Sequence, residues 1–149
     1  MFGMLKRIGG AAAKEVKAEY AANRDYLEAV CAAAALVANA DGEIEDSEKF
    51  KITKLIAGHP TLGKLYQQNV IEQTATEMFG RARDFAGRQQ LARELDDIKG
   101  REGGAQMAED IYLVAVDIAH ADGELEAAEK DVLQRIANRL GVDPSKFEF

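Results

Sequence analysis

Two short acidic segments carry carboxylates at a spacing that could bind a metal ion. Residues 40–49 read ADGEIEDSEK and residues 121–130 read ADGELEAAEK, so seven of the ten positions are identical at an offset of 81 residues. In each segment an aspartate precedes a glycine that can reverse the chain, and a glutamate follows seven positions after the aspartate. We therefore predict that Asp41, Glu48, Asp122 and Glu129 are metal ligands.

Each segment also matches the second half of an EF-hand calcium loop. In that loop a glycine makes the sharp turn and the last glutamate chelates the ion. Asn39 and His120 fall on a ligand position, but the first ligand position holds Val37 and Ile118, which cannot chelate. One segment alone therefore supplies too few oxygens for Ca²⁺ or Mg²⁺.

Other polar side chains could complete a site for Ca²⁺, Mn²⁺, Mg²⁺ or Zn²⁺. Packing both loops at one end of the molecule would pool their carboxylates, and a bridging cation would then offset the repulsion between them. An antiparallel crossing of the two preceding helices would instead bring Glu109 near Asp41 and Glu28 near Asp122. The second-choice ligands are Glu43, Glu45, Glu124, Glu126, Asn39, His120, Glu28 and Glu109.

The same acidic loops also have an explanation without a metal ion. A carboxylate in the first turn of a helix interacts favourably with the helix dipole, by about 0.3–1 kcal/mol. Asp-Gly is a common turn sequence, and glycine ends helices at little cost. Repetition of the segment favours a metal site. The alternative, that the turn is repeated only because it determines the fold, stays open.

Composition narrows the classes of function. The chain of 149 residues has a single cysteine, Cys31, which excludes a disulfide framework and a cysteine-based zinc site. Two serines and two histidines leave little for a nucleophilic catalytic site, and a net charge of -7 argues against nucleic-acid binding. We expect a non-enzymatic metal-binding adaptor or sensor in the cytoplasm. The alternatives are a metal-assisted hydrolase that uses the acidic cluster and a metal-free structural interaction module.

Helical periodicity runs through the chain, so we predict a single all-α domain of about seven helices. Leu27, Val30, Cys31 and Ala34 form a narrow apolar stripe, and Ile52, Leu55 and Ile56 should face inward. Gly80 should interrupt the helix that precedes it. The expected helices cover residues 23–40, 46–57, 61–66, 68–79, 84–99, 105–121 and 127–140, with a last turn at 145–148.

The repeat predicts how these helices are organised. Residues 23–58 form the first helix-Asp-Gly-helix hairpin, residues 105–140 the second, residues 61–100 link them, and residues 143–149 form a C-terminal turn. Two such hairpins packed face to face would make a four-helix core with a pseudo-twofold axis.

The start of the chain differs in charge from the rest. Residues 1–22 are predicted to form a basic helix, and the first 24 residues carry a net charge of +3. Phe2, Met4, Leu5 and Ile8 give this segment a weak apolar face. It could touch an anionic membrane surface, as a peripheral contact at the inner face of the membrane, or pack on the protein's own core.

The two Asp-Gly-x-hydrophobic-x-x-x-Glu motifs at 41–48 and 122–129 resemble the TerB tellurite-resistance family. The start of the chain (1–24) and its ending (140–147) also resemble that family. The resemblance implies an all-helical fold with internal pseudo-symmetry and divalent-metal binding by the acidic positions of both motifs. It further implies a role in the ter stress-response system, which resists tellurite, phage and colicins, with a membrane protein of the TerC type as partner.

Overall fold

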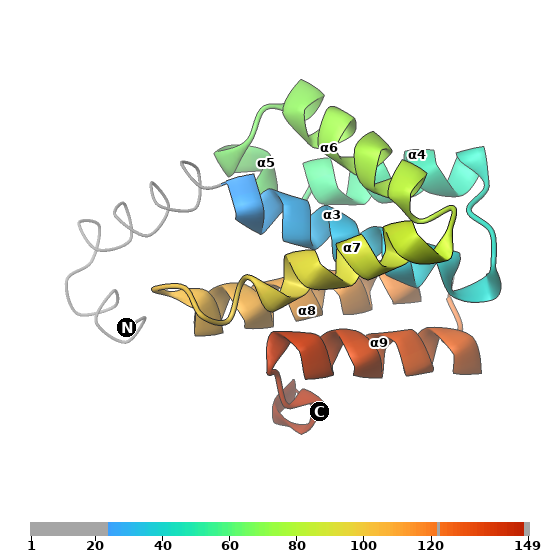
Figure 1. Cartoon of the computed structure of the whole chain (residues 1–149). Coiled ribbons are helices and arrows are strands. Elements are labelled where there is room, and N and C mark those ends of the chain that lie inside the picture. Colours follow the sequence, from blue (N-terminus) through green and yellow to red (C-terminus); the bar gives the residue numbers. More distant parts are fainter. Residues whose placement is uncertain (1–23, 122, 148–149) are drawn as a thin grey trace.

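The computed structural model describes residues 24–121 and 123–147, and these residues contain seven α helices and no strand. The all-α prediction is therefore confirmed (Figure 1). The helices are α3 (Arg24–Ala38), α4 (Asp46–Ala57), α5 (Leu62–Leu65), α6 (Gln68–Arg81), α7 (Phe85–Asp96), α8 (Gly104–His120) and α9 (Ala127–Leu140), with 3-10 turns η1 (Asn39–Asp41) and η2 (Pro144–Phe147).

Helix α3 is the central element of the core. It packs against α6, α7, α8 and α9, and Figure 1 shows these helices arranged around it. Eleven of its fifteen residues are buried, among them five alanines between positions 29 and 35. Because alanine side chains are small, neighbouring helices can approach the α3 backbone from several directions.

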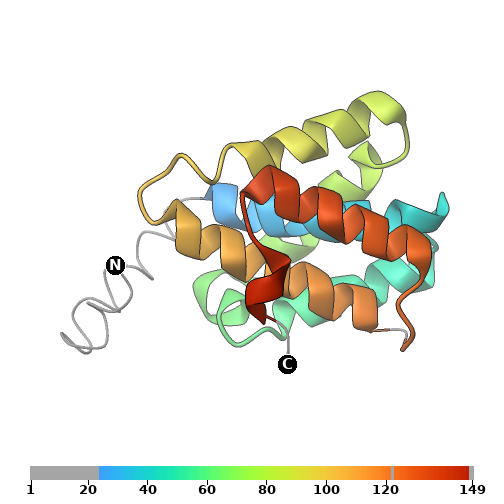
Figure 2. The same ribbon diagram turned by 90° about the horizontal axis from the view of Figure 1, so that it is seen from below.

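The second helix of each hairpin has different neighbours. Helix α4 packs mainly against α6, whereas α9 packs against α8, α7 and α3. Figure 2 shows α9 (red) lying beside α8 (orange). The linking helices α6 and α7 are thus part of the core, and the pseudo-twofold relation of the two hairpins stays a prediction.

Most helix boundaries follow the sequence closely, but α7 ends at Asp96 and not at residue 99 as predicted, and the predictions for Gly80 and Leu55 are also corrected. Helices α4 and α9 have the predicted bounds, and Gly141 ends α9 in the left-handed conformation at φ 73°. Gly80 does not interrupt its helix, because α6 continues to Arg81. A glycine keeps its backbone N–H and costs about 1 kcal/mol inside a helix, which tertiary packing can offset. Leu55 does not face inward, because 41% of it is exposed.

The basic segment predicted at 1–22 lies outside the described residues. Among the described helices, none is both long and apolar enough to cross a membrane.

Candidate functional site

The two acidic loops have the same backbone turn. Gly42 has φ 101° and Gly123 has φ 99°, both in the left-handed region that favours glycine. The Gly42 N–H donates to the Asn39 carbonyl at 2.8 Å, and the Gly123 N–H donates to the His120 carbonyl at 3.0 Å. Each glycine thus reverses the chain at the end of one helix and directs it toward the next.

The next helix of each hairpin begins with a reciprocal capping box. The Glu45 N–H donates to Glu48 Oε1 at 3.3 Å, while the Glu45 side chain caps the backbone N–H of Glu48. The Glu126 N–H donates to Glu129 Oε1 at 3.1 Å, and its side chain likewise caps the backbone N–H of Glu129. The repeated Glu-x-x-Glu spacing therefore has a structural role, because it satisfies N–H groups that would otherwise lack a partner.

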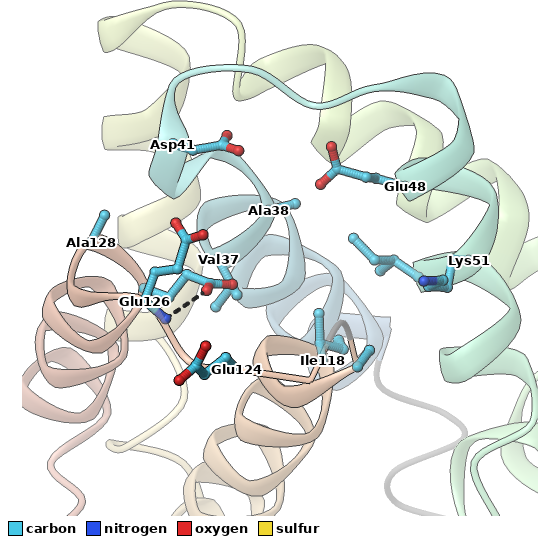
Figure 3. A pocket seen from close by; sticks show the side chains of 12 residues that line it. Val37, Ala38, Asp41, Glu48, Lys51, Ile118, Glu124, Glu126 and Ala128 are labelled. Carbon is cyan, nitrogen blue, oxygen red and sulfur yellow. Dashed lines mark hydrogen bonds between the residues drawn. The ribbon is translucent and has the colours of Figure 1, made fainter.

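Carboxylates from both hairpins line one cavity of about 210 Å³. Three of the four first-choice ligands, Asp41, Glu48 and Glu129, lie there, together with the second-choice residues Glu124 and Glu126. Figure 3 shows Asp41 and Glu48 on one side of this space and Glu124 and Glu126 on another. The fourth first-choice residue, Asp122, lies outside the described residues. The two acidic loops are thus gathered at one end of the molecule.

The remaining walls of the cavity are apolar or cationic. Val37, Ala38, Ile52 and Ile118 are buried and form part of its lining. Lys51 also lines it and brings a positive charge to the acidic surroundings (Figure 3). Lys51 was not predicted as a site residue, although its position three residues after Glu48 places both on one face of the helix.

The donor atoms of this cavity suit a hard divalent cation. Carboxylate oxygens are the ligands of Ca²⁺, Mg²⁺ and Mn²⁺, whereas zinc in proteins favours nitrogen and sulfur. The lining residues contribute no histidine or cysteine. Burial raises the pKa of the Cys31 thiol to about 12, so Cys31 is not a thiolate at neutral pH.

The side chains are not drawn together around a single point. Within the described part of the chain, no three His, Cys, Asp or Glu side chains are close enough to hold a metal ion. Glu48 and Glu129 each use Oε1 in a capping box and have a second carboxylate oxygen. Coordination by these residues would therefore require their side chains to rotate toward the centre of the cavity.

The other four second-choice ligands of the acidic loops, Asn39, Glu43, Glu45 and His120, do not line the cavity. The Glu43 N–H donates to Asp41 Oδ1 at 3.3 Å, and Glu43 and Asn39 line a neighbouring hollow. Glu45 and His120 are exposed and do not line the cavity.

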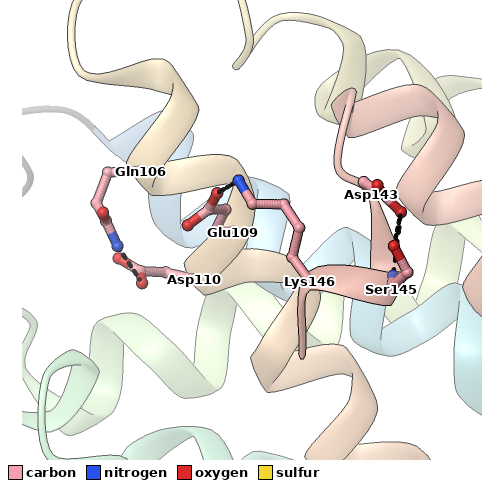
Figure 4. A network of polar contacts seen from close by, with 6 residues as sticks. All are labelled: Gln106, Glu109, Asp110, Asp143, Ser145 and Lys146. Carbon is pink, nitrogen blue, oxygen red and sulfur yellow. Dashed lines mark hydrogen bonds and ion pairs between the residues drawn. The ribbon is translucent and has the colours of Figure 1, made fainter. Parts of the chain in front are cut away.

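Glu28 and Glu109, the repeat-related pair, have unlike surroundings and are also absent from the cavity. Glu109 forms an ion pair with Lys146 at 3.2 Å, which ties η2 to α8 (Figure 4). At Glu28, burial and then Asp25 raise the pKa of the carboxyl. The structure thus does not bring Glu109 together with Asp41 in the acidic cavity.

Comparison with known proteins identifies the family of this chain. The family model described as "Tellurite resistance protein TerB" matches residues 27–149, which include both acidic loops and every described helix except the first residues of α3. The comparisons with curated proteins and with solved structures found no match. Because the match covers most of the chain, the protein belongs to the TerB family.

Proposed function

We propose that this protein is a non-catalytic adaptor or sensor of tellurite and stress resistance that binds a divalent cation in the acidic cavity. The observation that carries the proposal is the gathering of carboxylates from both hairpins, Asp41 and Glu48 from one and Glu124, Glu126 and Glu129 from the other, around one cavity. A cation held there would join the two hairpins. It would also offset the repulsion between their carboxylates.

The chemistry of the donors selects among the cations. Ca²⁺, Mn²⁺ and Mg²⁺ are favoured over Zn²⁺, because the lining donors are carboxylate oxygens. Binding of a cation to the folded state stabilises it by about 2.7 kcal/mol at a concentration of 100 times Kd. For a domain of this size the melting temperature would rise by roughly 5–10 °C.

The partners in this proposal are those that the family resemblance implies. The protein would act in the cytoplasm, with a membrane protein of the TerC type as partner. Residues 1–24, with a net charge of +3, would add a peripheral contact with anionic lipid. Binding to phosphatidylglycerol vesicles should then weaken as salt is raised and disappear when residues 1–24 are deleted.

The cation proposal is tested by thermal unfolding in CaCl₂, MnCl₂ and MgCl₂ against NaCl of equal ionic strength. We expect the divalent salts to raise the melting temperature further, since specific coordination survives where simple screening does not. Asp41→Asn and Glu124→Gln should remove most of that difference. Glu43→Gln is the matched control, because it removes the same charge from the same loop but does not line the cavity. Coordination would be rejected if all salts raised the melting temperature equally. It would also be rejected if Glu43→Gln lost as much of the difference as Asp41→Asn and Glu124→Gln.

A metal-free structural module is the second candidate, and the capping boxes favour it. They account for Glu45, Glu48, Glu126 and Glu129 as determinants of helix starts. In that case the divalent salts would have no specific effect, while loss of a cap would still lower stability.

A metal-assisted hydrolase would instead release nitrophenol from p-nitrophenyl phosphate in the presence of the cation, and that release would be lost in Asp41→Asn.

A further inference from the structure

A second hollow lies on the opposite side of α4 from the acidic cavity, between α4 and α6. It has a volume of about 620 Å³ and is lined by residues of both helices. Figure 1 shows these two helices side by side at one edge of the fold. Glu48, Lys51 and Ile52 of α4 line the acidic cavity, whereas Lys49, Phe50 and Lys54 line this groove.

The groove presents apolar surface to solvent. Phe50 at its rim is 64% exposed, although Phe79 in its wall is only 4% exposed. The Lys54 ammonium lies 4.8 Å from the centre of the Phe50 ring. An exposed aromatic ring beside a concave apolar surface is typical of a binding site for another molecule.

The groove is positively charged in an acidic protein. Among the described residues, Lys49, Lys54 and Arg83 line it together with one carboxylate, Glu72, whereas the whole chain has a net charge of -7. Lys49 also forms an ion pair with Asp46 outside the groove at 3.5 Å, whereas no such ion pair is seen for Lys54 or Arg83 within the described residues. Glu72 accepts a hydrogen bond from Gln68 at 3.1 Å. The charge of the groove therefore complements a negatively charged ligand.

Gly80 gives this groove open space beside the α6 backbone. It lies inside α6, where alanine would make a more stable helix. Apart from its chain neighbours and the surrounding α6 backbone, a Cβ built at Gly80 meets no atom within 4 Å, so packing against the rest of the fold gives no reason for a glycine. Gly80 lines the groove, and its missing side chain leaves room for part of a ligand.

We propose that the groove between α4 and α6 binds a short acidic peptide segment of a partner protein. A large apolar side chain of the peptide lies over Gly80 beside Phe50, and flanking carboxylates pair with Lys49, Lys54 and Arg83. A peptide fits this site better than a lipid surface does, because the groove has walls from two helices and a bilayer is flat. The inference is independent of metal binding in the acidic cavity.

The test begins with selection of a random dodecapeptide library against the full chain. We expect enrichment of peptides that combine net negative charge with at least one Phe, Leu, Ile or Trp. Binding of a synthetic, fluorescein-labelled peptide from this selection is then measured by anisotropy. Its affinity should fall as salt is raised, and it should fall when its acidic residues are replaced by Gln.

Matched variants separate binding from folding. Phe50→Ala should weaken binding at least tenfold, whereas Phe85→Ala, which removes a 70% exposed ring outside the groove, should leave it unchanged. Lys54→Ala should weaken binding, whereas Lys64→Ala, at an exposed position of α5 outside the groove, should not. Gly80→Leu should abolish binding at an unchanged or higher melting temperature, because leucine favours helix and fills the groove.

Three results would overturn the proposal. The first is equal binding of the selected peptide by the wild type and Gly80→Leu. The second is binding to phosphatidylglycerol vesicles, but to no peptide, that is lost in Phe50→Ala. The third is a dimer of this chain that dissociates in Phe50→Ala, which would assign the groove to a second copy.

Discussion

The two hairpins are alike at their loops and differ in the helices that follow. Both loops have a glycine near φ 100°, the same glycine-to-carbonyl hydrogen bond and the same capping box. At the 81-residue offset, Ile52 and Leu133 are both buried. The next apolar pair at this offset, Leu55 and Ile136, differs in burial, since Leu55 is 41% exposed and Ile136 is 1% exposed.

The difference arises from the neighbours of each helix. Helix α9 packs against three helices, including central α3, and its apolar face is covered. Helix α4 packs mainly against α6, so Ile56 takes the inward position and Leu55 and Phe50 face solvent. A repeated sequence thus reproduced the turn, whereas the partner helices decided which side of each helix became surface.

The largest expected effect separates Leu55 from Ile136. Ile136→Ala should lower the free energy of unfolding by about 2–5 kcal/mol, because it leaves a cavity in the core. Leu55→Ala should cost less than about 1 kcal/mol, because its side chain already contacts solvent. Urea denaturation followed by circular dichroism measures both. Ile52→Ala and Leu133→Ala serve as the control pair and should cost similar amounts; equal costs for Leu55 and Ile136 would contradict the asymmetry.

Much of the fold could be predicted from the sequence because its signals are local. The bounds of α4 and α9 follow from the Asp-Gly loops that precede them and from Gly58 and Gly141 at their ends. The prediction that Gly80 interrupts its helix was wrong, because an interior glycine weakens a helix without ending it. The exposure of Leu55 could not be predicted, since it depends on where α6 lies.

The candidate site was only partly predictable for the same reason. Spacing along the chain identified Asp41, Glu48 and Glu129, which the cavity brings together. Spacing did not distinguish Glu124 and Glu126, which line the cavity, from Glu43 and Glu45, which do not. That distinction depends on the arrangement of the hairpins. The capping role of the glutamates was missed because serine or threonine usually begins a capping box.

The capping boxes give an effect of intermediate size that should be the same in both hairpins. Glu45→Ala and Glu126→Ala should each lower the free energy of unfolding by about 1 kcal/mol in a chelator, because a helix N–H loses its acceptor. Glutamine at either position should cost less, since its amide oxygen still accepts a hydrogen bond. Clearly unequal alanine costs in chelator would show that the two caps differ in strength.

Added CaCl₂ should then separate the two caps. Glu126→Gln should reduce the stabilisation by calcium, because Glu126 lines the acidic cavity, while Glu45→Gln should leave it intact. Thermal unfolding with and without the salt measures the difference. An equal calcium effect in both variants would remove Glu126 from the proposed ligands.

The smallest expected effect has opposite sign in the two hairpins and concerns Glu28 and Glu109. Burial, followed by the neighbouring Asp25 and Glu94, raises the pKa of Glu28, so the charged carboxylate destabilises the folded state. Glu28→Gln should therefore stabilise the protein at pH 7, by less than about 1 kcal/mol because solvent screens the site. Glu109→Gln should slightly destabilise it, by at most about 1 kcal/mol, through loss of the exposed ion pair with Lys146.

The pH dependence of stability is the most specific test of the charge on Glu28. Because the pKa of Glu28 in the folded protein lies above its ordinary value of 4.5, the folded state takes up a proton first as the pH falls. The advantage of Glu28→Gln should be complete at pH 7, shrink as the pH falls through the folded pKa, and disappear below about pH 4.5. Urea denaturation of the wild type and both variants at pH 7, 5.5 and 4.5 measures it. An advantage that persists at low pH would mean that glutamine stabilises the helix by some route other than removal of the charge.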